Sequence, residues 1–92
     1  MVEIKKFWSP SCGPCRMLAP IMEKVMVDYP SVKLIDINTD EDINNGRVNI
    51  DKYGIRSIPA VFIEKDGEIV EKFLGVKTEQ EIRNLIDSVI NN

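Results

Sequence analysis

The spacing of apolar residues in the first half of the chain predicts a strand, a helix and a second strand. Residues 2–8 are rich in β-branched and aromatic side chains and short enough for a buried strand, although Lys5 and Lys6 interrupt the alternation. Residues 12–29 carry apolar side chains at helical spacing, which predicts a helix with one face packed on a sheet. Residues 32–37 form a second strand-like run, so we expect a right-handed parallel βαβ unit.

The second half of the chain predicts a hairpin followed by a helix. Residues 60–65 and 68–74 flank an Asp-Gly dipeptide, which is typical of a type I′ turn between antiparallel strands. Thr78 is followed three residues later by Glu81, a spacing that indicates a capping box at the start of the last helix. The pattern therefore joins a βαβ half to a ββα half.

A polar segment, residues 38–53, separates the two halves. Its apolar anchors are sparse and indicate at most a weak helix, with a turn at Asn45 and Gly46. The Asn, Asp and Glu content of residues 38–49 predicts a solvated loop there. No repeat and no linker divides the sequence, so we expect a single domain that covers residues 1–92.

Charge and composition make nucleic acid and membranes poor candidates for partners. The formal net charge is -3, which gives no general attraction to phosphate backbones or anionic lipid. The longest apolar stretch, near residues 58–63, is far short of the roughly 20 residues of a membrane span. The N-terminal residues build no apolar core of a secretory signal, so we expect a cytoplasmic protein.

The residue types present restrict the available chemistry to thiols, carboxylates and amines. The chain has no histidine, which excludes Ser/His/Asp and Cys/His nucleophilic schemes and histidine-ligated zinc. Its two cysteines cannot complete a tetrahedral zinc site by themselves. We therefore expect no metal in a single chain.

The two cysteines stand in the motif Cys12, Gly13, Pro14, Cys15, where the first strand gives way to the helix. A helix N-terminus directs partial positive charge and unpaired N–H groups at the first thiol and favours its thiolate. Cys12 is thus predicted to be the nucleophile, and Cys15, one turn deeper, to attack the mixed disulfide that Cys12 forms with a substrate. Pro14 presets a helical φ, and Gly13 leaves the approach to the sulfur open.

Two other interpretations of the cysteine pair stay open. A purely structural disulfide would close a loop of only four residues, which stabilises by about 2 kcal/mol in the chain-entropy model. The cytosol also keeps thiols reduced, so a structural disulfide is not expected there. Metal coordination would need ligands from a second chain. A C-x-x-C motif beside a βαβ unit favours redox chemistry over both.

Further features of the sequence, together with C-G-P-C, resemble the thioredoxin family over nearly the whole chain. They are Phe7 and Trp8 before the motif, Pro20 after it, the run Y-G-I-R-S-I-P that ends at Pro59, the Asp66-Gly67 turn, and Gly75. The resemblance implies an α/β protein with the minimal thioredoxin fold. This fold is a four-stranded mixed sheet of order 2-1-3-4, with strand 3 antiparallel to strand 1, flanked by about three helices.

The resemblance also implies a function. The protein would be a thiol:disulfide oxidoreductase that reduces protein disulfides through Cys12 and Cys15 and needs no prosthetic group. The peptide bond before Pro59 would be cis, and Ile58, Pro59 and Gly75 would form a groove for an extended substrate segment beside the active-site loop. The partners would be disulfide-containing proteins and an electron donor such as a thioredoxin reductase, and we expect a monomer.

Three positions depart from the family pattern. Ser11 stands where a tryptophan usually precedes the first cysteine, which changes the contact surface for partners. Lys6 occupies the position of the family's buried acid, and Leu34 that of its companion lysine. A cation near the thiols favours the thiolate, so Lys6 is a candidate modulator of the thiol pKa; the alternative is a lysine that extends to solvent.

Three alternative functions also stay open. One is a glutaredoxin-like reductase that uses glutathione, and another is a binding module that keeps the fold without turnover. The third is a dimer that shares a metal ion between two C-x-x-C pairs.

Overall fold

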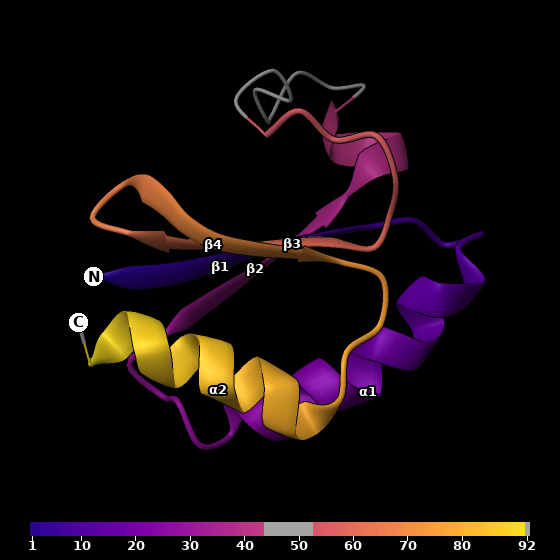
Figure 1. Cartoon of the computed structure of the whole chain (residues 1–92). Coiled ribbons are helices and arrows are strands. Elements are labelled where there is room, and N and C mark those ends of the chain that lie inside the picture. The colour runs from indigo at the N-terminus through magenta and orange to yellow at the C-terminus, as the bar shows by residue number, and fades with distance from the viewer. Residues whose placement is uncertain (44–52, 92) are drawn as a thin grey trace.

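A mixed four-stranded sheet forms the centre of the protein (Figure 1). The computed structural model describes residues 1–43 and 53–91. The strands are β1 (Val2–Trp8), β2 (Lys33–Asn38), β3 (Ala60–Lys65) and β4 (Glu68–Leu74). Their order is β2-β1-β3-β4, with β1 and β2 parallel and β3 antiparallel to both of its neighbours. The predicted order and directions are confirmed.

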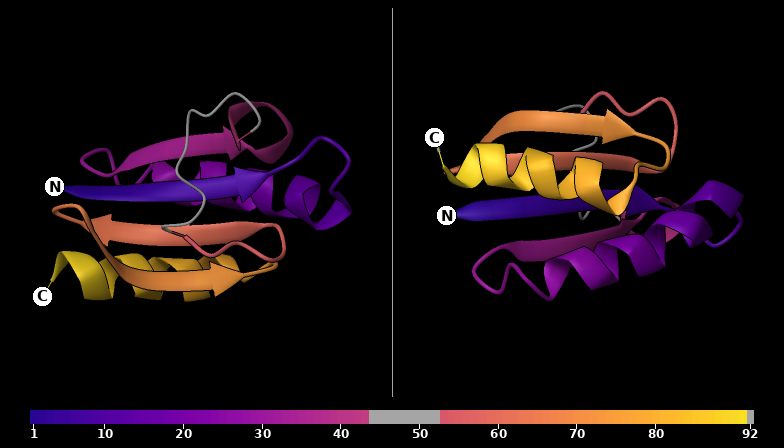
Figure 2. Two further views of the ribbon diagram at one scale, coloured as in Figure 1. Left: turned by 90° about the horizontal axis from the view of Figure 1, so that it is seen from above. Right: turned by 60° about the horizontal axis from the view of Figure 1, so that its bottom comes forward.

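Helices α1 (Gly13–Met26) and α2 (Glu79–Ile90) pack on the same face of the sheet (Figure 2). A short helix, η1 (Thr39–Ile43), follows β2 on the side away from α1 and α2, as Figure 1 shows. Residues 39–43 thus form a short helix at the start of the segment in which the sequence indicates a weak helix, and this part of the chain is not the loop predicted for residues 38–49. The turn predicted at Asn45 and Gly46 lies outside the described residues.

The main core lies between the sheet and the two longer helices. Its central residues, such as Ile4, Leu18 and Ile86, have no exposed surface. Apolar residues at helical spacing on α1 and α2 supply most of this core, which is why both helices lie on this face. The buried members are Ile4, Leu18, Met22, Val25, Val32, Val61, Ile63, Phe73, Ile82, Ile86 and Val89.

A smaller aromatic cluster covers the other face of the sheet. The ring of Tyr53 lies 5.0 Å from that of Phe7 and 4.9 Å from that of Phe62. Its hydroxyl donates a 2.6 Å hydrogen bond to the buried carboxylate of Glu64, which also accepts from Lys5 Nζ at 3.2 Å. Burial, followed by this hydrogen bond, raises the pKa of Tyr53. Tyr53 is therefore fixed on the sheet at the start of the segment that leads to Pro59.

The hairpin and the last helix carry the local geometry that the sequence predicts. Asp66 and Gly67 both have positive φ, 53° and 89°, as a type I′ turn requires. The Thr78 side chain accepts a hydrogen bond from the backbone N–H of Glu81 at 3.2 Å, and the Glu81 carboxylate accepts one in return from the Thr78 backbone. The capping box is confirmed.

Thr78→Ala should lower the free energy of unfolding by about 1 kcal/mol, because the Glu81 N–H loses its side-chain acceptor. Urea denaturation followed by circular dichroism measures the change. Thr78→Ser keeps the hydroxyl and serves as the control, with stability close to that of the unchanged chain. An Ala variant as stable as the Ser variant would show that the cap contributes nothing.

Candidate active site

Cys12 and Cys15 form a disulfide at the junction of β1 and α1. Cys12 is the N-cap of α1 and Cys15 lies in its first turn, with their Cα atoms 5.3 Å apart. A tight turn after β1, closed by the Cys12 N–H donating to the Ser9 carbonyl at 3.2 Å, places the pair at the helix start. Cys12 is half-buried, whereas Cys15 is only 5% exposed. The predicted difference in depth between the two sulfurs is observed.

The surroundings of the Cys12 sulfur favour negative charge. The backbone N–H of Cys15 donates to Cys12 Sγ at 3.2 Å, and no acidic residue lies in the first turn of α1. A helix N-terminus with a free N–H directed at a sulfur lowers the cost of its thiolate. Arg16 directs its guanidinium to the Pro10 carbonyl at 2.7 Å and so ties the preceding loop to the helix.

The segment that contains Pro59 lies next to Cys12. The Ile58–Pro59 peptide bond is cis, as the resemblance implies. The Ile58 carbonyl oxygen is 3.8 Å from Cys12 Sγ, and the Gly75 N–H donates to the Pro59 carbonyl at 2.9 Å. Gly75 has φ 77°, a conformation that L side chains rarely adopt. The fold therefore brings Ile58, Pro59 and Gly75, which are far from Cys12 in sequence, to the same end of the sheet.

The remaining loop residues frame this site. Gly13, Pro14 and Ser11 are exposed, and the Ser11 hydroxyl is 3.3 Å from that of Ser9. Three exposed apolar side chains adjoin the same elements and were not predicted from the sequence: Met17 on α1, and Leu74 and Val76 on either side of Gly75. The sequence does not distinguish such residues from core residues, because they carry the same side-chain types.

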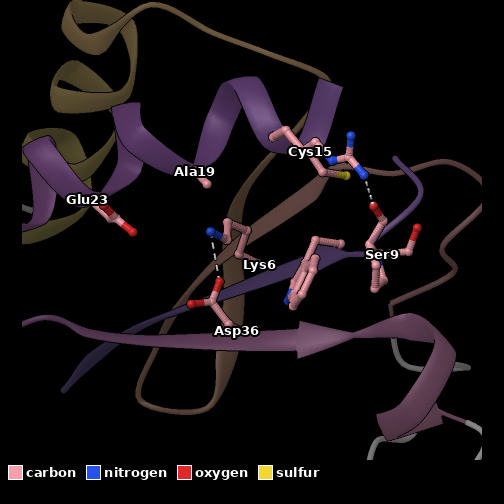
Figure 3. Close-up of a pocket in the computed structure, with 9 residues that line it drawn as sticks. Lys6, Ser9, Cys15, Ala19, Glu23 and Asp36 are labelled. Carbon is pink, nitrogen blue, oxygen red and sulfur yellow. Dashed lines mark hydrogen bonds and ion pairs between the residues drawn. The ribbon is translucent and has the colours of Figure 1, made fainter. Parts of the chain in front are cut away.

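A pocket of about 260 Å³ adjoins the Cys15 side chain beneath α1 (Figure 3). Lys6 lies in it with only 9% of its side chain exposed, and its Nζ is 2.8 Å from Asp36 Oδ1. Lys6 therefore does not extend freely into solvent, the alternative considered above. The pocket is lined by Lys6, Trp8, Ser9, Pro10, Cys15, Arg16, Ala19, Glu23 and Asp36.

Asp36 is a residue of this pocket that the sequence analysis missed. It is the register partner of Lys6 across the parallel strands β1 and β2, so both side chains project on the same face. Leu34, two residues earlier on β2, projects on that face as well and packs against the main core. The sequence signal for this ion pair was that two strands predicted to lie side by side carry residues of opposite charge, Lys6 and Asp36.

Two further observations concern ligands and membranes. Within residues 1–43 and 53–91, no group of three or more Cys, Asp or Glu side chains could hold a metal ion. Neither α1 nor α2, nor any other helix in the described ranges, has the length and apolar character needed to cross a bilayer.

Comparisons with known proteins support one family. A family model described as thioredoxin matches residues 2–88. Thioredoxin 1 of Synechococcus elongatus is 40% identical over 82 residues, covering 88% of this chain and 73% of the relative. The thioredoxin of Bacillus subtilis is 36% identical over 87 residues, covering 94% and 80%. A chloroplastic M-type thioredoxin of Triticum aestivum is 40% identical over 88 residues, which cover 95% of this chain and 48% of the relative.

These matches agree with the geometry of the site. Thioredoxins are disulfide oxidoreductases that use a redox-active cysteine pair and need no other cofactor, and such a pair is present here at the start of α1. The chain belongs to the thioredoxin family, and its activity is exchange between a dithiol and a disulfide.

Proposed function

We propose that Cys12 is the attacking thiol and Cys15 the resolving thiol in the reduction of protein disulfides. The observation that carries this assignment is the asymmetry of the pair. Cys12 is half-buried at the helix N-cap with an N–H directed at its sulfur, whereas Cys15 is buried one turn deeper. A substrate can therefore reach only the sulfur whose thiolate is better stabilised.

Reduction proceeds in two exchanges. The Cys12 thiolate attacks one sulfur of the substrate disulfide, forms a mixed disulfide and releases the other substrate sulfur as a thiolate. Cys15 then loses its proton and attacks Cys12 Sγ, which releases the second substrate thiolate. Two electrons have passed to the substrate, and the protein is left with the disulfide seen in the structure.

The groove beside Cys12 is proposed to hold the substrate. Ile58, Pro59 and Gly75 supply a backbone wall next to the reactive sulfur, and an extended peptide can pair with such a wall through main-chain hydrogen bonds. The exposed loop residues Gly13 and Pro14 leave the sulfur accessible. Trp8 and Ser11 complete the active-site loop.

Lys6 is proposed to favour the thiolate form of the pair. Its ammonium shares the pocket with Cys15 and is largely excluded from bulk water. A positive charge in such surroundings lowers the free energy of a nearby thiolate more than it would in water. Asp36 moderates this effect, because its carboxylate is paired with Lys6.

The proposed partners follow from membership of the family and from the proposal that the protein reduces its substrates. The substrates are disulfide-containing proteins, and a thioredoxin reductase or a similar donor restores the dithiol. The protein acts as a monomer whose single domain contains the whole site, in the cytoplasm, where thiols are kept reduced.

Trapping tests these assignments. Cys15→Ser should accumulate mixed disulfides with cellular proteins, because the intermediate at Cys12 can no longer be resolved. Non-reducing electrophoresis and mass spectrometry would detect the adducts and identify the proteins. The double variant Cys12→Ser/Cys15→Ser is the matched control and should trap nothing. Adducts formed equally by both variants, or by neither, would contradict the assigned order of attack.

A further inference from the structure

Two arginines near the active site carry positive charge that the fold does not neutralise. Arg16 lies near the start of α1, and Arg56 lies in the segment that leads to Pro59. Both residues are exposed. Within residues 1–43 and 53–91, neither of them forms an ion pair.

The acidic side chains around the site are engaged elsewhere or lie apart from the arginines. Asp36 is bound to Lys6 at 2.8 Å. Glu23 follows the arginine of α1 by seven residues, or about 10 Å along the helix axis. Asp40 and Glu41 lie on η1, which is on the side of the sheet away from α1 (Figure 1), and in the described chain they pair with neither arginine. Unpaired positive charge thus remains beside the thiols of a protein whose formal net charge is -3.

The guanidinium of Arg16 is held beside the loop that leads to Cys12. Its Nη2 donates to the Pro10 carbonyl at 2.7 Å, and Pro10 precedes Cys12 by two residues. A guanidinium has five N–H donors in a rigid plane, so this hydrogen bond leaves others available to a carboxylate. Arg16 is therefore both fixed in position and able to bind an anion.

Arg56 approaches the same sulfur from a different element. It precedes Ile58 by two residues, and the Ile58 carbonyl oxygen is 3.8 Å from Cys12 Sγ. Two residues span at most about 7 Å of chain. An extended substrate segment that pairs with the Ile58 backbone therefore passes the base of the Arg56 side chain about two residues from the cysteine that is attacked.

We propose that Arg16 and Arg56 select substrate segments in which acidic residues flank the attacked cysteine. This proposal rests on the proposed function, in which Cys12 attacks a segment held beside Ile58. The two guanidinium groups bind Asp or Glu carboxylates of the substrate, whereas lysines in the same places are repelled. Because both arginines are exposed, each contact is weak and is screened by salt. The selection acts on association with the substrate more than on the exchange step.

Three cyclic peptides that differ only beside their disulfide test this selection. The positions that flank each cysteine carry aspartate, serine or lysine. Fully reduced protein is mixed with excess peptide at low ionic strength and quenched with acid, and the reduced peptide is quantified by chromatography. Each rate is divided by the rate at which 2-mercaptoethanol reduces the same peptide, which removes differences in intrinsic reactivity.

The aspartate peptide should react about tenfold faster than the lysine peptide, or about threefold for each arginine, as expected for exposed ion pairs. The serine peptide should lie between them. High salt should bring the three rates together, because it screens the charges.

Substitutions of the arginines separate local contacts from net charge. Arg16→Gln/Arg56→Gln should abolish the preference, whereas Arg16→Lys/Arg56→Lys keeps both charges and should retain most of it. Lys33→Gln/Lys65→Gln is the matched control. It removes the same charge where Lys33 and Lys65 pair with the start of β1, the end of that strand away from the thiols, and it should keep the full preference. A change in the reactivity of Cys12 itself cancels, because it affects all three peptides alike.

The outcomes for the arginines and for the proposed function differ. Equal normalised rates for the three peptides with the unchanged protein would overturn the role of Arg16 and Arg56 and leave the proposed function in place. A preference that persists in the double Gln variant of the arginines, or is lost as fully in the lysine control, would overturn that role as well. Reduction of the peptides by Cys12→Ser at the unchanged rate would instead overturn the proposed function.

Discussion

Cys12→Ser should lower the rate of disulfide reduction by more than about 10³-fold, because a serine hydroxyl does not ionise near neutral pH and cannot form the mixed disulfide. The rest of the site has no second nucleophile that could replace it, since Cys15 is only 5% exposed. Reduction of insulin with dithiothreitol as the electron donor, followed by turbidity, measures the loss. Ser31→Ala, at an exposed loop position after α1, is a suitable control and should retain full activity.

The same variant separates catalysis from binding without turnover. A module that acts only by holding a partner would keep its biological activity in Cys12→Ser, because the fold and the groove at Ile58 and Gly75 do not depend on the thiol. Full activity of Cys12→Ser in a cell that lacks the unchanged protein would therefore reject the catalytic assignment. Loss of activity in both the cell and the insulin assay would reject the binding module.

The sequence predicted the elements whose signals are local. The bounds of β1, β3 and β4 agree with the prediction because each short apolar run ends at a strong turn signal, such as Asp66 and Gly67. The end of α1 was placed too late, since the apolar spacing continues to Tyr29 although the helix ends at Met26. Tyr29 packs against the main core from outside the helix, and its hydroxyl donates to Asp87 on α2 at 2.6 Å. Its apolar character reflects this tertiary contact and not helical periodicity.

The polar contacts at the site could not be predicted in the same way, because they depend on strand register. Lys5 and Lys6 are adjacent in sequence but point to opposite faces of β1. Lys5 contacts Glu64 on one face, and Lys6 contacts Asp36 on the other. The partner of each lysine is fixed by how β1 aligns with strands that are distant in sequence, and no local pattern specifies that alignment. The thiol pair was therefore visible in the sequence, whereas the pocket around Cys15 was not.

Phe7→Ala should lower the free energy of unfolding by about 3–5 kcal/mol, which is a large part of the roughly 5–15 kcal/mol typical of a domain. Phe7 is fully buried, and its ring packs against Tyr53 at 5.0 Å and Phe62 at 5.6 Å. Truncation removes apolar surface and leaves a cavity that the rigid strand cannot close. Urea denaturation measures the loss. Val27→Ala, at a side chain that is 77% exposed, removes apolar atoms without a cavity and should change stability by less than about 0.5 kcal/mol.

The effect of Phe7→Ala should also reach the active site, because Tyr53 begins the segment that carries Ile58 and Pro59 to Cys12. With one side of the Tyr53 ring unsupported, that segment is less firmly held on the sheet, and the groove beside the sulfur is less well formed. Under conditions where the variant is folded, KM for a protein substrate should therefore rise. The rate at which Cys12 reacts with dithiobisnitrobenzoate, a small aromatic disulfide that does not need the groove, should stay nearly unchanged. A loss of stability below about 1 kcal/mol would contradict the packing of Phe7, since a buried aromatic ring cannot be truncated at so small a cost. A large loss of stability with an unchanged KM would show instead that the groove is held by the Gly75 contact to Pro59 and not by the aromatic cluster.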